Sequence, residues 1–263
     1  MSSPNIEVSQ HDGICEILIS RPERKNALTH GMYTALHEAV SAAEADSGVR
    51  VLMISGAGQC FTSGNDLQDF LQHPPQDENA PVMVLLDKLL HARKPIVAAV
   101  SGHAVGIGTT LLLHCDLVYC DTTARFQLPF ANLGLCPEAG SSYLLPLMAG
   151  HRKAAELLML GQPFSPETAR EIGLVNEVVS PEALPALAQA RARQLADQPT
   201  AAVLLTKSLL RKAPHDALAA HMKFEGGHFM ARLNSPEAIE AFTAFQDKRK
   251  PDFRQFDPKA LPQ

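Results

Sequence analysis

The sequence lacks several features that would define a class of protein. No apolar run approaches the roughly 20 residues that span a bilayer. Residues 1–11 hold no apolar signal-peptide core, and residues 260–263 do not form a peroxisomal Ser-Lys-Leu-type address. No basic stripe with interleaved aromatic residues is present, and the net charge is -5. We therefore expect a cytoplasmic protein that binds neither a membrane nor a nucleic acid.

Cysteine is scarce as well. The five cysteines are an odd number, and Cys115 and Cys120 are too far apart for a Cys-x-x-Cys pair. No group of cysteines has metal-ligand spacing, so we expect reduced thiols and no metal site. Hydrophobic residues, in contrast, make up 46% of the chain. They are enough to bury one large domain, or one domain with a helical appendage.

Short β-branched runs alternate with helical patterns in the first half of the chain. This alternation predicts an α/β fold with parallel strand pairing. Thr29 can cap a helix that continues to about Ala45, and the polar, Pro-rich residues 72–81 predict a loop. The expected strands are 14–19, 49–55, 96–100 and 117–120, and further helices are expected at 82–92 and 108–114.

Beyond His151 the periodicity is helical almost throughout. The chain therefore divides into an α/β core, residues 1–197, and a C-terminal helical region, residues 198–263. The expected helices of this second half are 183–196, 200–212, 215–232 and 236–245.

Two glycine-rich loops, residues 55–67 and 101–111, each follow an expected strand. If each loop presents one backbone N–H, the pair forms an oxyanion hole, a site that stabilises a negatively charged oxygen. A dinucleotide loop is disfavoured, because the third glycine of that fingerprint falls on Phe61. His103, in the second loop, is interpreted as a structural hydrogen-bonding residue.

Glu138 lies on a Gly- and Pro-broken turn and is the only carboxylate between Asp121 and Glu156. No nearby acid competes for the role of acid or base. A lone carboxylate can move one proton between two carbons, whereas hydration needs a second group to activate water. The sequence therefore favours single-base chemistry at Glu138.

Taken together, these segments resemble the crotonase (enoyl-CoA hydratase/isomerase) superfamily over nearly the whole chain. The order and spacing of the segments carry the resemblance, since each alone is weak. They are residues 21–28 (RPERKNAL), 61–67 (FTSGNDL), 95–102 (PIVAAVSG), 115–119 (CDLVY) and 245–250 (FQDKRK).

The resemblance implies a spiral of ββα turns with a C-terminal helical region that forms a homotrimer or a dimer of trimers. It implies an acyl-CoA thioester as ligand and no separate cofactor, because coenzyme A is part of the substrate. The oxyanion hole would be the backbone N–H groups of Asn65 and Ile107. Asp66 and Asp116 would have structural or CoA-contacting roles, and Lys248 or Lys250 would reach CoA from a neighbouring subunit. The implied substrate contacts are Arg24, Lys25, Ala27, Ser63, Gly64, Asp66, Leu67, Gly106, Phe130 and Leu133.

Within the superfamily, hydratases use two glutamates, and these positions fall on Thr110 and Phe130. The chain instead resembles the peroxisomal-type Δ3,Δ2-enoyl-CoA isomerases of fatty-acid β-oxidation. In these the catalytic glutamate corresponds to Glu138, and Ala139 here replaces a glycine. An apolar lining from Phe130, Leu133 and Leu135 would raise the pKa of that base. A 2-enoyl-CoA hydratase and a non-catalytic acyl-CoA-binding protein remain the alternatives, and a family hydrolase or dehalogenase is less favoured.

Overall fold

The computed structural model describes residues 3–256 and contains a six-stranded sheet with the strand order β1-β2-β3-β4-β6-β8. β1 and β2 form an antiparallel hairpin, which the sequence analysis missed because it expected no strand at residues 6–11. Each following pair in this sheet is parallel, and parallel pairing was predicted. Residues 1–2 and 257–263, which include the end of the expected C-terminal region, lie outside the described residues. The strands are β1 (Ile6–His11), β2 (Ile14–Ile19), β3 (Val51–Gly56), β4 (Ile96–Val100), β6 (Leu117–Asp121) and β8 (Glu177–Val179).

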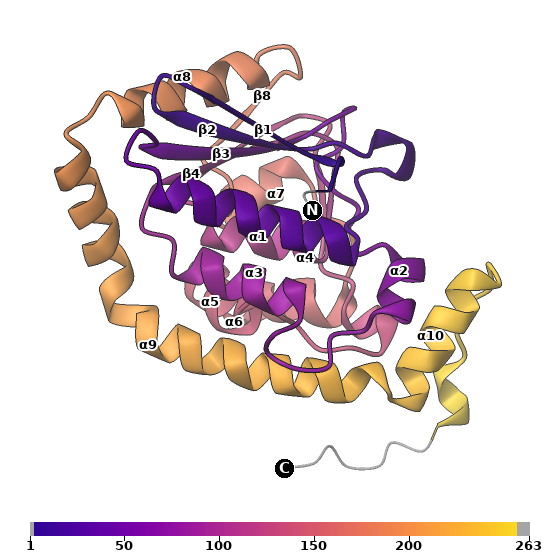
Figure 1. Ribbon diagram of the computed structural model, residues 1–263. Helices are drawn as coiled ribbons and strands as arrows, with labels where there is room; N and C mark the ends of the chain where they lie inside the picture. Colours follow the sequence, from indigo (N-terminus) through magenta and orange to yellow (C-terminus); the bar gives the residue numbers. More distant parts are fainter. Residues whose placement is uncertain (1–2, 257–263) are drawn as a thin grey trace.

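Helices cover both faces of this sheet (Figure 1). Successive side chains of a strand point to opposite faces. Val51 and Met53 pack with α8, whereas Leu52 and Ile54 join the main core beneath α1 and α3. This burial on both faces explains why the parallel strands are continuous apolar runs. The helices of this layer are α1 (His30–Ala45), α3 (Pro81–Leu90) and α8 (Leu184–Ala196), and Thr29 caps α1 as expected.

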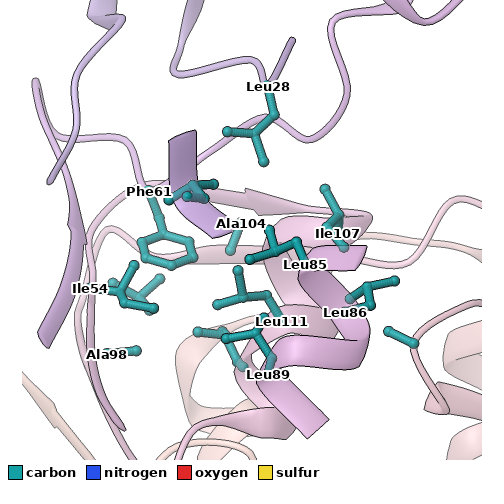
Figure 2. Close-up of a cluster of buried hydrophobic side chains, with 14 of the residues drawn as sticks. Leu28, Ile54, Phe61, Leu85, Leu86, Leu89, Ala98, Ala104, Ile107 and Leu111 are labelled. Carbon is teal, nitrogen blue, oxygen red and sulfur yellow. The ribbon is translucent and has the colours of Figure 1, made fainter. Parts of the chain in front are cut away.

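A second, two-stranded parallel sheet lies against the main core and carries the second glycine-rich loop. Figure 2 shows Phe61, Leu85, Leu111 and Ile107 among the buried side chains between these layers. The packing of these residues fixes the second glycine-rich loop, residues 101–111, around Ile107. The second sheet is β5 (His103–Val105) and β7 (Arg125–Gln127), and the short helices near it are α2 (Leu67–Gln72), α4 (Ile107–Thr110), α5 (Ser141–Ala149), α6 (His151–Ala155) and α7 (Pro166–Glu171).

The C-terminal region differs from the sequence prediction at Pro214. Two helices were expected there, but α9 (Thr200–Leu233) is continuous, with Pro214 inside it, and α10 (Pro236–Gln246) follows. Proline removes one helical hydrogen bond, and contacts to the core on both sides of it hold α9 together. Figure 1 shows α9 running along the edge of the α/β core towards α10. β8 was also missed, because its three residues are too few to show a period.

An ion pair anchors α9 to the sheet. The Lys207 ammonium group is buried and donates to Asp116 Oδ2 (2.7 Å) and to the Lys94 carbonyl (2.6 Å). The same Asp116 oxygen accepts the Ile96 backbone N–H (2.8 Å) at the start of β4. Asp116 was expected to have either a structural or a CoA-contacting role, and these contacts are structural. None of the described helices has the length and apolar character needed to cross a membrane.

We predict that Asp116→Ala lowers the free energy of unfolding by about 2–3 kcal/mol, because it leaves the Lys207 ammonium buried without its carboxylate. Urea denaturation followed by circular dichroism measures this. The control is Asp87→Ala, whose carboxylate is 73% exposed beside His91 and whose loss should change stability by less than about 0.5 kcal/mol. Equal effects of the two variants would contradict the anchoring role.

Candidate active site

A cavity of about 1440 Å³ opens between the two glycine-rich loops, the Glu138 turn and the C-terminal helices. Its wall combines the backbone of the loops with apolar side chains, among them Leu135, Phe229 and Phe242. Every residue that the sequence placed in the site lies on this wall: Arg24, Lys25, Ala27, Ser63, Gly64, Asn65, Asp66, Leu67, Gly106, Ile107, Phe130, Leu133 and Glu138.

Direct backbone contact brings the two loops together. Thr62 N–H donates to the His103 carbonyl (2.9 Å), and Val105 N–H donates to the Thr62 carbonyl (3.1 Å). Gly64 is required here, because its φ is +89° and a Cβ would lie 2.7 Å from the Val105 carbonyl oxygen. His103 was expected to be a structural hydrogen-bonding residue, and its carbonyl accepts this bond from Thr62 while the residue itself is exposed.

The candidate oxyanion donors are the backbone N–H groups of two residues on the cavity wall. Asn65 follows Gly64 in the first loop, and Ile107 is the first residue of α4. Neither N–H donates a hydrogen bond within residues 3–256. The Tyr33 hydroxyl, from α1, donates to Asn65 Oδ1 and so helps to fix Asn65, which lies on the cavity wall. The sequence did not indicate a role for Tyr33, because its position in the pattern of α1 is that of an ordinary core residue.

Glu138 is the buried carboxyl group of the cavity wall. Its side chain accepts a hydrogen bond from the Thr110 hydroxyl at Oε1, and no described residue donates to Oε2. Thr110 is the first of the two positions that the family resemblance matches to a hydratase glutamate. The other, Phe130, is 5% exposed and packs edge-on against Phe229. The site thus holds a hydroxyl group and an aromatic ring in place of two acids.

The surroundings of Glu138 change its proton affinity. The pKa of Glu138 is raised to about 8: burial is the largest cause, the Thr110 hydrogen bond opposes it, and the negative charge of Glu225 adds to the increase. The direction agrees with the effect expected from an apolar lining. A carboxylate with a pKa near neutrality is a stronger base than an ordinary glutamate, which suits abstraction of a weakly acidic carbon-bound proton.

Two residues that the sequence did not reveal hold the Glu138 turn. Burial lowers the pKa of His114 to about 4, so its neutral ring donates from Nε2 to the Ala139 carbonyl (2.9 Å). Glu225 of α9 accepts the Gly140 N–H (2.6 Å). Both residues are distant from Glu138 in sequence, and neither belongs to a motif, so only the fold could show their proximity.

The polar rim of the cavity includes the segment expected to meet CoA. Arg24 and Lys25 are exposed there, and Asp66 pairs with the Arg21 guanidinium (2.7 Å) while capping α2. Contacts of Arg24 and Lys25 with CoA phosphates stay a prediction. Lys248 and Lys250 are exposed and do not line the cavity of this chain, so their reach from a neighbouring subunit is also a prediction.

Comparison with known proteins identifies the class that this fold and site define. The family model described as Enoyl-CoA hydratase/isomerase matches residues 9–257. The chain belongs to this family, the crotonase superfamily of enzymes, which confirms the resemblance seen in the sequence.

Individual relatives cover most of the chain. The 1,2-epoxyphenylacetyl-CoA isomerase of Escherichia coli (strain K12) is 35% identical over 250 residues, which are 92% of this chain and 95% of that protein. Enoyl-CoA delta isomerase 2 of Rattus norvegicus is 37% identical over 253 residues, 94% of this chain and 64% of that protein. The solved structure of Pseudomonas aeruginosa OdaA has a TM-score of 0.90 and 48% identity, covering 92% of this chain and 99% of that chain.

We predict a pH-dependent stability difference between the wild type and Glu138→Gln. The folded protein favours the neutral carboxyl, with a pKa of about 8 against the ordinary 4.5. The contribution of this carboxyl to the free energy of unfolding is fully present below pH 4.5, and it is lost as the pH rises through 8. Glutamine cannot ionise, so the variant should become more stable than the wild type by a few kcal/mol between pH 5 and pH 9.

Urea unfolding at several pH values measures this difference. Glu38→Gln, which changes an exposed glutamate of α1, is the control and should show no such widening. A constant gap between wild type and Glu138→Gln across this range would contradict the raised pKa.

Proposed function

We propose that the protein is a Δ3,Δ2-enoyl-CoA isomerase that shifts the double bond of a 3-enoyl-CoA to give the 2-trans-enoyl-CoA. The observation that carries this proposal is the single buried, hydrogen-bonded carboxyl of Glu138 in a cavity whose two hydratase positions are Thr110 and Phe130. The family supplies the acyl-CoA thioester as the class of substrate.

The proposed reaction uses one base for both proton transfers. The thioester oxygen accepts hydrogen bonds from the N–H groups of Asn65 and Ile107. The Glu138 carboxylate removes a proton from C2, and the C3=C4 electrons delocalise into a dienolate whose negative oxygen the two amides stabilise. Glu138 then returns the proton to C4, which leaves a C2=C3 double bond. No cofactor takes part, since coenzyme A belongs to the substrate.

The energetics of the site support this assignment. An oxyanion donor typically contributes about 3–4 kcal/mol, and exclusion of water strengthens it. Thr110 holds Oε1 of Glu138, so Oε2 is available to the substrate. The raised pKa of Glu138 makes it a better match for the weak acidity of a thioester α-proton.

Two of the compared relatives favour rearrangement over hydration. The Escherichia coli and Rattus norvegicus proteins are both named as isomerases of CoA thioesters. The Escherichia coli relative suggests a second candidate, rearrangement of an epoxide-bearing arylacetyl-CoA, for which the aromatic lining of the cavity leaves room. We further propose that the protein takes part in fatty-acid β-oxidation, assembles as a trimer and is cytoplasmic.

We predict that Glu138→Gln lowers kcat on trans-3-hexenoyl-CoA by at least about 10³-fold, because the variant retains the cavity and loses the base. Chromatography that separates 2-enoyl and 3-hydroxyacyl products measures the turnover. The control is Glu156→Gln, which alters the next acid along the chain, paired with Lys153 on the surface, and should leave kcat unchanged.

Three results would overturn the assignment. Formation of 3-hydroxyacyl-CoA by wild type and mutant alike would indicate a hydratase. Saturable binding of the thioester without turnover would indicate an acyl-CoA-binding protein. Turnover of 1,2-epoxyphenylacetyl-CoA without turnover of the 3-enoyl substrate would favour the second candidate.

A glycine on α9 offers a test of where the acyl chain lies. Gly226 is buried on the cavity wall, and a Cβ there would lie 2.6 Å from Met83 Cε. Gly31 of α1 is exposed and does not line the cavity, and a Cβ there meets nothing within 4 Å. We predict that Gly226→Val lowers kcat/KM about 10-fold more on trans-3-dodecenoyl-CoA than on trans-3-hexenoyl-CoA. The control is Gly31→Val, the same change at a helical glycine away from the cavity, which should discriminate less, and equal discrimination would place the acyl chain elsewhere.

A further inference from the structure

A second buried carboxylate lies behind the Glu138 turn and takes no part in the proton transfers proposed above. Glu225 of α9 is 5% exposed, and its carboxylate is directed at the first turn of α5. Gly140 N–H donates to Oε2 (2.6 Å), and Ser142 N–H donates to Oε1 (2.9 Å). The Ser142 hydroxyl donates to Oε1 as well. Both carboxylate oxygens therefore bind the beginning of one helix.

This contact caps a helix that has no cap of its own. The residue before α5 is Gly140, which has no side chain, so the first N–H groups of the helix need an acceptor from elsewhere. The positive end of the helix dipole favours a carboxylate at this position. Glu225 thus contributes from the C-terminal region what a local serine or aspartate normally provides.

The capped Gly140 belongs to the turn that directly follows Glu138. Ala139 and Gly140 both have left-handed backbone conformations, with φ of +58° and +73°. Alanine rarely adopts this conformation without support. The Ala139 carbonyl accepts from His114, and the Gly140 N–H donates to Glu225, so the turn is held from both sides. Releasing either contact lets the turn relax and the Glu138 side chain move.

We propose that Glu225 is a positioning residue for Glu138: its carboxylate fixes the left-handed Ala139–Gly140 turn and places a negative charge behind the base. This inference rests on the proposed function. Its second effect is electrostatic, since the Glu225 charge raises the pKa of Glu138 in addition to burial. The other titratable groups that face the two carboxylates are Tyr33 of α1, His114, Cys136 of the turn and His221 of α9, whose Nε2 lies 3.6 Å from Glu225 Oε1.

The first test is Glu225→Gln, measured as kcat and KM for trans-3-hexenoyl-CoA between pH 5 and pH 9. Glutamine has one acceptor oxygen, so one of the two backbone N–H groups of α5 loses its partner. We expect kcat to fall about 10- to 100-fold with KM changed by less than about 3-fold, because a displacement of the base near 1 Å has this effect. The pH at half-maximal kcat should also move to lower pH, since a charge that disfavours ionised Glu138 is removed.

The matched control is Asp216→Asn, which removes the same charge from the same helix at a fully exposed position. It should leave kcat and the pH profile unchanged. A Glu225→Gln enzyme with wild-type kcat and an unshifted profile overturns the proposal. So does a variant that is less stable but has both quantities intact, because that pattern describes a purely structural cap.

A conservative substitution and a rescue separate geometry from charge. Glu225→Asp keeps the charge and withdraws the carboxylate by one methylene, so kcat should fall while the pH profile moves less than in Glu225→Gln. Ala139→Gly should restore part of the lost kcat in the Glu225→Gln background, because glycine adopts the left-handed conformation unaided. Lack of any rescue would contradict the link through the turn. If Glu225→Gln fails to fold, Glu225→Asp with and without Ala139→Gly carries the same comparison.

Failure of the proposed function is distinguishable from failure of this inference. A wild-type protein inactive on 3-enoyl-CoA overturns the isomerase assignment alone. The titration of the Glu138 carboxyl is then read without turnover, from the infrared difference between each protein and its Glu138→Gln counterpart. A lower titration midpoint in Glu225→Gln than in wild type and Asp216→Asn supports the inference, and identical midpoints overturn it.

Discussion

Burial of the Glu138 carboxyl group is the constraint on which the rest of the site depends. A carboxyl group removed from water keeps its proton to higher pH unless its neighbours stabilise the charge. Among residues 3–256 the Thr110 hydroxyl is the one group that stabilises the charge by a side-chain hydrogen bond, while Glu225 opposes ionisation. The group is therefore a base of raised strength in a wall of apolar side chains. A more open turn would give an ordinary carboxylate and a weaker base.

The fold maintains this burial with segments that are distant in sequence. β5 holds the second loop against the first through backbone hydrogen bonds, and α9 crosses behind the Glu138 turn. Lys207 and Glu225 lie in the same continuous helix, so the ion pair with Asp116 at the sheet and the cap on α5 share one rigid element. The C-terminal region is in this sense part of the candidate site, and not only a cover over it.

Much of the site could be predicted from the sequence, because its residues lie in local segments with their own signals. Gly64 and Gly106 mark turns that need positive φ, and Glu138 stands alone in its segment. Tyr33, His114 and Glu225 could not be predicted in this way. They act across 25 to 85 residues of chain, and their side chains read locally as unremarkable positions of helices. The break expected at Pro214 was wrong for a related reason, since tertiary contacts outweigh a single local propensity.

Thr110 and Phe130, the two positions that the resemblance matches to hydratase glutamates, are best interpreted as a pair. Replacement of one glutamate by Thr110 alone would leave a second acid near the substrate, and replacement by Phe130 alone would leave an acid able to hold water. With both changed, Thr110 becomes a hydrogen-bond donor to Glu138, and Phe130 fills apolar space against Phe229. Each position thus supports the Glu138 carboxyl: Thr110 holds one of its oxygens, and Phe130 contributes apolar surface to the same cavity wall. One oriented base in an apolar wall is the arrangement on which the proposed proton transfer within the substrate rests.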